Sequence, residues 1–373
     1  MEKDQTNIKV VLAAGGTGGH LFPAQTLAQK LKQKDESIEI IFVGPNLGSS
    51  PYFNKDVFSY HEITSATPFK KNPIESIKAL FPLTKGVIQS LKFLKKFKPK
   101  ILVGFGSFHS FPILVAAKLL SIPIVLFEAD ALPGKVNRLF SRWARVSAIH
   151  FIKAAEYLHG KTISVAMPLK KKKEEICKKK AREYFQLDGD RLTFLIFGGS
   201  QGAQSINRFF CESLEKLLKK PLDFQVIHIT GNPERAEKLK LIYDQYHIPC
   251  FVKSFEENLH LARIAADLSI SRAGASSVAE MIEFGTPGIV IPYRYGGNHQ
   301  EKNAEFIANE IGGAIRLREG ELTSDQLVTT IEEILHSSEE KLNLMRRALS
   351  EYYQNRTKKE LSEVIFDIIN TSK

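Results

Sequence analysis

Short, continuously apolar runs alternate with longer stretches of helical periodicity along almost the whole chain. Continuous runs rich in valine and isoleucine are typical of parallel strands that are covered on both faces. Their alternation with helical stretches predicts repeated strand–helix–strand units, and therefore an α/β fold with parallel sheets. We expect strands at Ile8–Leu12, Ile38–Val43, Ile101–Val103, Ile124–Phe127, Leu192–Phe197, Phe224–Ile229, Leu268–Ile270 and Ile289–Ile291.

Two glycine-rich turns of similar design lie half a chain apart. The first, Gly15–His20, precedes the helical stretch Leu21–Leu31, and the second, Gly198–Gly202, precedes the helical stretch Ala203–Leu218. A strand, a glycine turn and a helix together present backbone N–H groups and a helix N-terminus to an anion. Their repetition predicts two similar Rossmann-like domains that close on a phosphorylated ligand.

The stretch between Thr162 and Asp190 is the expected domain boundary, because a proline lies next to blocks of lysine there. We therefore expect a first domain over residues 1–165 and a second over residues 166–340. Residues 341–373 have a helical pattern, and we expect these C-terminal helices to pack back on the first domain.

The composition of the 373-residue chain suits two hydrophobic cores, since 43% of its residues are apolar. The longest apolar stretch, Phe111–Leu120, is short and contains Lys118, so we expect neither a signal peptide nor a transmembrane helix. Three widely spaced cysteines fit a cytoplasmic protein and argue against a disulfide framework or a zinc site. The net charge of +11 favours nucleic acid, an anionic membrane surface or phosphorylated substrates as partners.

The first glycine turn carries side chains suited to chemistry on a phosphorylated substrate. Thr17 adds a hydroxyl donor there, as Ser200 does in the second turn. His20 comes at the start of a helix, whose positive end favours the neutral imidazole that a general base requires; a capping or packing role is the alternative. Neither turn has the G-x-G-x-x-G spacing of a dinucleotide site, so an NAD enzyme is not predicted.

A third cluster, Ser271–Glu280, consists mainly of small residues that open a helix after an expected strand. The N–H groups of such a helix can hold a phosphate. Glu280 lies about one turn further, on the face shared with Ser276 and Ser277, where its carboxylate can accept two hydrogen bonds from a ribose diol. Gln300, in the segment after the last expected strand, has an amide that can bind sugar hydroxyls.

Taken together, these motifs resemble the MurG family, the undecaprenyldiphospho-muramoylpentapeptide N-acetylglucosaminyltransferases of glycosyltransferase family 28. The resemblance implies a GT-B fold, in which two Rossmann-like domains face a cleft. It also implies inverting transfer of GlcNAc from UDP-GlcNAc to the muramoyl 4-hydroxyl of lipid I, which gives lipid II for peptidoglycan synthesis. The motifs that carry the resemblance are Gly15–His20 with Pro23 and Ala24, Val103–Gly106, Pro123–Glu128, Gly198–Ala203 with Asn207, Arg272–Glu280, and Gln300 with Asn303.

The resemblance also implies a role for individual residues. His20 is the matching candidate for the base that deprotonates the acceptor, and no metal or cofactor is implied. Matching positions in the donor site are Thr17, Gly18 and Gly19 at the sugar and phosphates, Ser200 at the diphosphate, Phe255 at the uracil, Ala275, Ser276, Ser277 and Glu280 at the phosphate and ribose, and Gln300 at the GlcNAc hydroxyls. The acceptor diphosphate is expected at Gly16, Gly104, Gly106 and Ser107.

Three segments depart from the family pattern. Asp130 stands where the family usually has asparagine, and a carboxylate there repels phosphate unless it faces the sugar. Lys170 replaces an arginine expected to cover the nucleotide base. Ser107–Phe111 replaces a more glycine-rich loop, which changes how the acceptor diphosphate is held.

Apolar side chains alternate with lysines along Ile74–Lys100. An apolar helix face rimmed by lysines suits an anionic bilayer surface; the alternative is an amphipathic helix that covers the sheet, and different faces can do both. The undecaprenyl-diphosphate acceptor and this segment together predict a peripheral enzyme on the cytoplasmic face of the bacterial inner membrane.

Three other functions fit parts of the sequence. A UDP-GlcNAc 2-epimerase has the same fold and nucleotide site, but it has no use for the basic, apolar segment Ile74–Lys100. A related lipid glycosyltransferase differs only in a few donor contacts. A nucleic-acid binder would explain the charge, but the lysines lack the aromatic pattern of single-strand binders, so no nucleic acid is expected.

Overall fold

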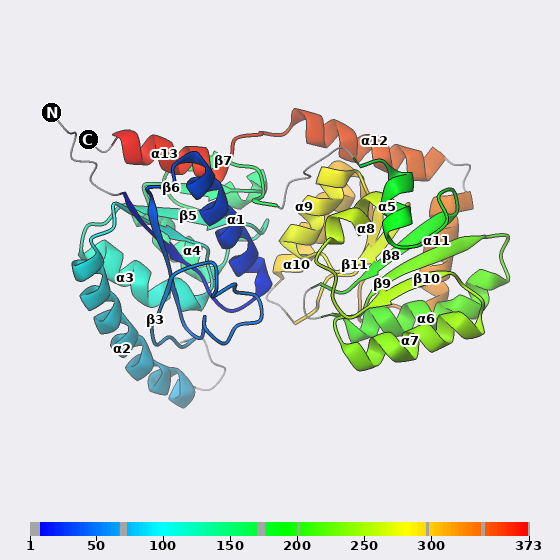
Figure 1. Ribbon diagram of the computed structural model, residues 1–373, viewed down its shortest axis with the longest axis horizontal. Helices are drawn as coiled ribbons and strands as arrows, with labels where there is room; N and C mark the ends of the chain where they lie inside the picture. Colours follow the sequence, from blue (N-terminus) through cyan, green and yellow to red (C-terminus); the bar gives the residue numbers. More distant parts are fainter. Residues whose placement is uncertain are drawn as a thin grey trace. The chain divides into compact units, whose positions relative to one another are not determined.

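The computed structural model describes residues 8–67, 73–169, 176–199, 202–295, 298–336 and 340–371 (Figure 1). The chain divides into two compact units, of which the first comprises residues 1–169 and 357–373 and the second residues 170–356. Each unit is built around a parallel sheet.

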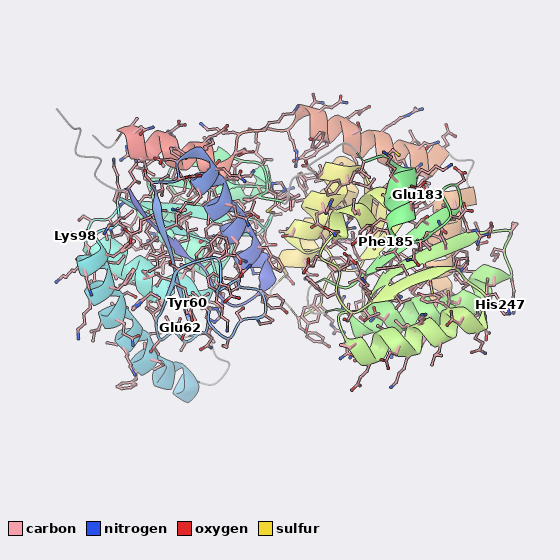
Figure 2. All side chains as sticks on the ribbon, in the orientation of Figure 1. Tyr60, Glu62, Lys98, Glu183, Phe185 and His247 are labelled. Carbon is pink, nitrogen blue, oxygen red and sulfur yellow. The ribbon has the colours of Figure 1, made fainter. Side chains whose placement is uncertain are left out.

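The sheet of the first unit has the strand order β3-β2-β1-β4-β5-β6-β7. Its strands are β1 (Lys9–Ala13), β2 (Glu39–Gly44), β3 (Tyr60–Glu62), β4 (Ile101–Gly104), β5 (Ile124–Glu128), β6 (Val146–Ile149) and β7 (Thr162–Ser164). The central strands β4, β5 and β6 are buried along their whole length, which is why most of them read as apolar runs. At the edge, β3 carries Tyr60 and Glu62 (Figure 2). The carboxylate of Glu62 accepts a hydrogen bond from the N–H of Gly48 at 2.9 Å.

The helices of the first unit follow the strands in the alternation that the sequence predicts. They are α1 (Gly18–Lys34), α2 (Pro73–Phe97), α3 (Phe111–Leu119), α4 (Lys135–Phe140) and α13 (Leu361–Thr371), with the short helices η1 (Phe108–Ser110), η2 (Ser141–Trp143) and η3 (Ile152–Tyr157). Helix α2 packs against α3, and Leu94 of α2 lies in the core beside Ile113 and Leu114 of α3. Full burial of one such side chain stabilises the fold by about 1.5–3 kcal/mol.

The sheet of the second unit has the strand order β10-β9-β8-β11-β12-β13. Its strands are β8 (Leu192–Phe197), β9 (Phe224–Ile229), β10 (Cys250–Lys253), β11 (Leu268–Ser271), β12 (Gly288–Val290) and β13 (Ala314–Arg316). The helices are α5 (Lys178–Tyr184), α6 (Gln204–Leu218), α7 (Pro233–Gln245), α8 (Leu259–Ala265), α9 (Ala275–Phe284), α10 (His299–Glu305), α11 (Ser324–His336) and α12 (Glu340–Asn355), with a π-helical segment, η4 (Phe306–Ile311). Phe194, Phe210 and Leu327 join β8, α6 and α11 in one core.

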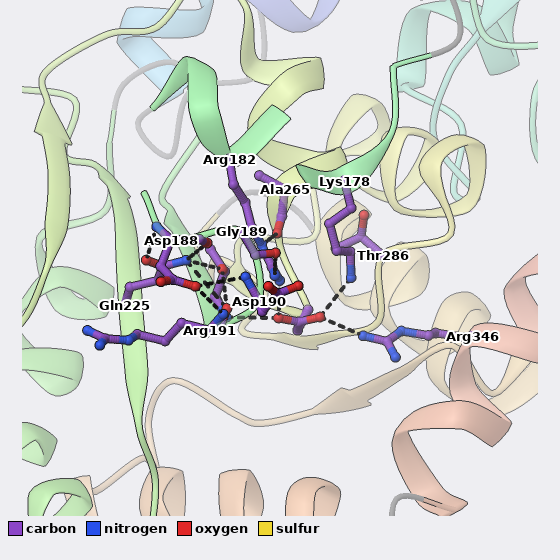
Figure 3. Close-up of polar contacts among 12 residues, drawn as sticks. Lys178, Arg182, Asp188, Gly189, Asp190, Arg191, Gln225, Ala265, Thr286 and Arg346 are labelled. Carbon is purple, nitrogen blue, oxygen red and sulfur yellow. Dashed lines mark hydrogen bonds and ion pairs between the residues drawn. The ribbon is translucent and has the colours of Figure 1, made fainter. Parts of the chain in front are cut away.

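A buried ionic cluster connects the start of this unit to its sheet. Asp267, just before β11, accepts hydrogen bonds from Arg182 of α5 at 2.5 Å and from Lys178 at 2.7 Å (Figure 3). Arg346 of α12 approaches the same carboxylate at 2.9 Å. The cluster therefore holds α5 and α12 to the sheet. Its members lie far apart in the chain, so no local sequence pattern predicts their contact.

The fold class predicted from the sequence is confirmed. Every expected strand is present, and each of its ends lies within one residue of the expected position. Both sheets are parallel, and α13 packs against α1, where Lys30 and Glu360 form an ion pair at 2.9 Å. Of the C-terminal helices, α13 belongs to the first unit, whereas α12 belongs to the second and packs against α9 and α11.

Candidate functional site

In both sheets the winding of the chain reverses at one pair of neighbouring strands. The reversal lies between β1 and β4 in the first unit and between β8 and β11 in the second. In open parallel sheets a ligand crevice forms outside the carboxyl ends of such a pair, because the connecting loops leave it in opposite directions. The two glycine turns follow β1 and β8 directly, so each lies at one of these switch points.

The first glycine turn joins β1 to the start of α1. Gly16 has a φ of +90°, which side chains rarely adopt, and it directs the chain into the helix. Thr17 is the N-cap residue, but its hydroxyl does not cap the helix; Thr17 Oγ1 lies 3.3 Å from Nδ1 of His20. The first turn of α1, which contains Gly18 and Gly19, carries no acidic side chain. Its N–H groups and positive end therefore have the polarity of an anion site.

The loop after β4 lies beside this turn, because β1 and β4 are neighbours. Gly104 ends β4, and Gly106 and Ser107 have positive φ angles of +80° and +68°. Ser107 Oγ lies 3.3 Å from Nδ1 of His109 and accepts a hydrogen bond from the His109 N–H at 3.4 Å. The His109 ring lies against Gly16, where a Cβ would come within 2.8 Å of Nδ1.

These contacts place Gly16, Gly106 and Ser107 at one edge of the sheet, as expected for residues of a common site. His109 was not singled out from the sequence. No local sequence pattern indicates that a side chain in the loop after β4 contacts the turn after β1. The contact follows from the pairing of the two strands in the sheet.

Asp130 lies just beyond the end of β5, the next strand along this edge. The carboxylate of the buried Glu128 accepts hydrogen bonds from the N–H groups of Asp130 and Gly134, both at 3.0 Å, and from Nδ2 of Asn137 at 2.9 Å. Burial raises the pKa of Glu128 to about 7, and the charge of Asp130 adds to the rise. The strand next to the first switch point therefore ends in two neighbouring carboxyl groups, of which Glu128 has a pKa raised to about 7. No pattern in the sequence indicates this shift.

The second glycine turn is shaped by close backbone packing. A Cβ on Gly198 would lie 2.0 Å from the backbone N of Ala203, and one on Gly202 would lie 2.4 Å from the carbonyl oxygen of Thr230. Gly199 has a φ of +89°. Two of the expected substrate-binding residues, Ser200 and Lys170, lie outside the described residues. Glycine is thus required at these positions for the conformation of the turn, independently of any ligand.

Helix α9 begins directly after β11, at the other side of the second switch point. Gly274 is its N-cap residue, and Asn303 Nδ2 donates to the carbonyl oxygen of Ala273 at 3.0 Å, which fixes the turn that starts the helix. Ala275 and Ser276 are half-buried and Ser277 is buried. No acidic side chain lies in the first turn of α9, so this helix start also favours a bound anion.

Glu280 follows in the second turn of α9 and pairs with Arg263 of α8. Nε of Arg263 lies 3.4 Å from Oε2 of Glu280. Burial raises the pKa of Glu280, and the guanidinium of Arg263 opposes that rise. The pattern of residues 271–280 indicates Glu280 but not its partner Arg263, which comes from a different helix.

Arg272 connects the elements around the second switch point. Its guanidinium donates to Glu319 Oε1 at 2.5 Å, to Ser205 Oγ at 3.0 Å and to the carbonyl oxygen of Ile291 at 3.1 Å. Ser205 lies in the first turn of α6, and Ile291 follows β12. Arg272 therefore holds the start of α6, the end of β11 and the end of β12 in a fixed arrangement.

The remaining expected residues lie at the same carboxyl edge of the second sheet. Phe255 follows β10 and is 57% exposed. Gln300 lies in the first turn of α10, and its Oε1 accepts a hydrogen bond from the N–H of Tyr293 at 2.9 Å. The second unit thus gathers Ala275, Ser276, Ser277, Gln300 and Phe255 on the edge where the switch point lies.

Two further observations on the described residues concern metal ions and membrane-spanning helices. Within this part of the chain, no three or more His, Cys, Asp or Glu side chains are grouped so as to hold a metal ion. None of the helices described combines the length and the apolar character needed to cross a membrane.

Comparison with known proteins finds relatives along nearly the whole chain. Glycosyltransferase family 28 models match twice, the N-terminal domain over residues 10–149 and the C-terminal domain over residues 193–364. The UDP-N-acetylglucosamine–N-acetylmuramyl-(pentapeptide) pyrophosphoryl-undecaprenol N-acetylglucosamine transferase of Protochlamydia amoebophila is 41% identical, covering 96% of this chain and 95% of its own. The protein of the same name from Chlamydia pneumoniae is 35% identical, covering 97% and 98%.

Solved structures show the same fold. The crystal structure of Acinetobacter baumannii MurG matches with a TM-score of 0.74 and 23% identity, over 98% of this chain and 99% of its own. A UDP-glucose:anthocyanidin 3-O-glucosyltransferase in complex with UDP matches with a TM-score of 0.69 and 14% identity, over 98% and 100%. Each unit therefore has the Rossmann-like architecture of a GT-B glycosyltransferase.

Proposed function

The chain belongs to glycosyltransferase family 28, and from this membership we propose that it transfers GlcNAc from UDP-GlcNAc to the muramoyl 4-hydroxyl of lipid I. The product is lipid II, the disaccharide precursor of peptidoglycan, and the configuration at the anomeric carbon inverts. The observation that carries the proposal is 41% identity over 96% of the chain to a transferase named for this reaction. The two switch points supply the anion-binding geometry that a diphosphate donor and a diphosphate acceptor require.

The second unit supplies the donor site in this proposal. The start of α9, with Ala275, Ser276 and Ser277, binds phosphate through N–H groups and hydroxyls, together with Ser200 of the second glycine turn. Glu280 accepts hydrogen bonds from the ribose diol, Phe255 contributes backbone groups to the uracil, and Gln300 binds GlcNAc hydroxyls. The positive end of α9 stabilises the negative charge that develops on the departing UDP. Lys170 is the proposed cover of the nucleotide base.

The first unit supplies the base and the acceptor site. The acceptor 4-hydroxyl attacks the anomeric carbon, its proton passes to the imidazole of His20, and the bond between that carbon and the diphosphate oxygen breaks. Thr17 Oγ1, at 3.3 Å from Nδ1 of His20, helps to orient the ring. General base catalysis of this kind contributes about 10²–10⁴-fold to the rate.

The acceptor diphosphate is assigned to the loops on either side of the first switch point. Gly16, Gly104, Gly106 and Ser107 form its backbone cradle, and the donor sugar and phosphates reach Thr17, Gly18 and Gly19. Asp130 faces sugar hydroxyls, because a carboxylate next to the phosphates would repel them. The positive φ angles of Gly16, Gly106 and Ser107 support a cradle in which N–H groups turn toward an anion.

Helix α2 is the proposed membrane contact. Phe81 is 79% exposed and Ile88 49% exposed, and the spacing of three or four residues places Lys85 and Lys92 on the same face. Leu94, on another face, is buried in the core, so one helix both covers the sheet and exposes an apolar, basic surface. Such a surface binds an anionic bilayer, where each well-placed lysine contributes about 1 kcal/mol. The enzyme then acts peripherally on the cytoplasmic face of the bacterial inner membrane.

The test of the proposed reaction is UDP release from UDP-GlcNAc, measured with and without a lipid I analogue that carries a shortened prenyl chain. We expect release only with the acceptor, and GlcNAc attached to the analogue in equal amount. A matched analogue without the muramoyl 4-hydroxyl should give no release. Conversion of UDP-GlcNAc without any acceptor would overturn the proposal in favour of a 2-epimerase.

A further inference from the structure

Arg263 is a fully buried arginine that forms an ion pair with Glu280. It lies on α8 with 0% of its side chain exposed, and its guanidinium stands 5.7 Å from the centre of the Phe197 ring. Nε lies 3.4 Å from Oε2 of Glu280, whereas Nη1 and Nη2 have no hydrogen-bond partner among the described residues. Burying a guanidinium whose N–H groups lack partners costs free energy, which packing alone does not require.

Within the described part of the chain, several other charged groups on or beside the helices around α9 have partners other than Glu280. Helices α8, α10 and α12 pack against α9. Arg356, after α12, pairs with Glu283, Arg346 with Asp267, Lys302 with Glu305, Arg316 with Glu301 and Glu305, and the ring of His260 on α8 contacts Phe284. Arg263 is therefore the cation that faces the carboxylate of Glu280.

The side chain of Glu280 is accessible to a ligand, whereas that of Arg263 is not. The side chain of Glu280 is 20% exposed and that of Arg263 is 0% exposed. An ionised carboxylate is an acceptor at both oxygens and can take one hydrogen bond from each hydroxyl of a diol, whereas a protonated carboxyl group gives up one of these acceptors. The charge of Glu280 thus decides how well it binds a diol.

We propose that Arg263 is a positioning residue that sets nucleotide specificity, by holding Glu280 as an ionised acceptor for both hydroxyls of a ribose. The inference rests on the proposed donor site, and Arg263 acts through Glu280 without touching the nucleotide. Without the guanidinium, the burial that raises the pKa of Glu280 acts unopposed, so the pKa rises further and the carboxyl group is ionised to a smaller extent at a given pH. Discrimination between ribose and deoxyribose is then weakened, and it returns as the pH rises and the carboxyl group ionises.

The experiment compares binding of UDP and 2′-deoxy-UDP by calorimetry between pH 6 and pH 9. The wild-type chain should prefer UDP by about tenfold or more throughout, the effect of roughly one hydrogen bond to a charged group. In R263M the preference should be several-fold smaller than in the wild-type chain at pH 7, and it should increase toward the wild-type value as the pH rises to 9. R263K, which retains a positive charge, should keep most of the preference at pH 7.

Arg182 provides a matched control in the same unit. It is also a buried arginine, with 4% of its side chain exposed, and it pairs with the carboxylate of Asp267 at 2.5 Å (Figure 3). R182M should therefore lower stability by a comparable or larger amount. Because Asp267 has no place in the donor site, R182M should keep the wild-type preference for UDP at every pH.

The outcomes separate this inference from the proposed function. If the wild-type chain binds neither nucleotide, the donor site itself is wrong. If the wild-type chain prefers UDP and R263M keeps that preference at all pH values, the positioning role of Arg263 is refuted while the donor site stands. The role is also refuted if R182M and R263M lose the preference together. Should R263M fail to fold, R263Q carries the same expectation with a neutral, polar side chain.

Discussion

Alanine at Gly16 should destabilise the first unit more than alanine at Gly199 destabilises the second. The two glycines occupy equivalent turns and have nearly the same φ, +90° and +89°. Forcing a side chain into a left-handed backbone costs roughly 1–2 kcal/mol at either position. The difference lies in the space around each Cα, and it can be read from the structure.

At Gly16 a new Cβ would lie 2.8 Å from Nδ1 and 3.0 Å from Cε1 of His109, whereas at Gly199 it would meet no described atom within 4 Å. The His109 ring must therefore move and lose its contact with Ser107, and overpacking of this kind costs about 1–3 kcal/mol more. At about 2–4 °C per kcal/mol for a unit of this size, the midpoint should fall by on the order of 10 °C for Gly16→Ala and 5 °C for Gly199→Ala.

Calorimetry on the wild-type chain, the two single variants, His109→Ala and the double variant Gly16→Ala/His109→Ala would test this reasoning. The double variant removes the ring that the new methyl group meets, so its loss should approach that of Gly199→Ala, with a coupling energy of about 1–2 kcal/mol in the cycle. Equal midpoint losses for the two glycine variants, or no recovery in the double variant, would show that His109 does not lie against the first glycine turn.

Three further predictions concern the base, the carboxylate pair and the membrane surface. His20→Ala should lower kcat by about 10²–10⁴-fold and leave UDP affinity by calorimetry unchanged; loss of UDP binding would instead indicate a structural role. Because the folded-state pKa of Glu128 is raised to about 7, its contribution to stability is complete below about pH 4.5 and is lost as the pH rises through 7. The free energy of unfolding, measured by urea titration, should therefore fall between pH 4.5 and pH 8 by about 3 kcal/mol more in the wild-type chain than in Glu128→Gln. If the free energies of the two chains depend on pH in the same way, the raised pKa is contradicted. Phe81→Ser with Ile88→Ser should weaken binding to phosphatidylglycerol vesicles in a flotation assay by about tenfold or more, and unchanged flotation would exclude α2 as the contact.

The sequence was sufficient to predict the strands at the centre of each sheet, because burial on both faces leaves a continuous apolar run. Leu192–Phe197 and Phe224–Ile229 are examples in which the expected and observed bounds agree. The strands it missed are short or partly polar. Strand β3, Tyr60–Glu62, lies at a sheet edge with two of its three side chains exposed, and β13 has only three residues, so neither leaves a readable pattern.

Within the candidate site, the sequence indicates side chains that can meet only where they are close together in the chain. Thr17 and His20 are three residues apart at a helix start, and the structure does bring their side chains to 3.3 Å. The partners that modify this chemistry come from elsewhere: His109 meets Gly16 across two strands, and Arg263 meets Glu280 across two helices. These pairs form because of the topology of the sheets and the packing of the helices. The spacing of residues in the sequence therefore does not predict them.

The two switch points share a backbone design but differ in the charge around them, and this difference supports the proposed division into a donor site and an acceptor site. The start of α9 has no acidic side chain in its first turn, and the carboxylate nearest to it along the helix, Glu280, is balanced by Arg263. That environment favours a diphosphate and the negative charge of a leaving nucleotide. The first switch point adds Asp130 and the titrating Glu128 to its helix start, and a second negative charge there would resist a phosphate placed close to β5. In the proposed function, this charge favours an acceptor diphosphate that lies toward Gly16 and the start of α1, away from Asp130.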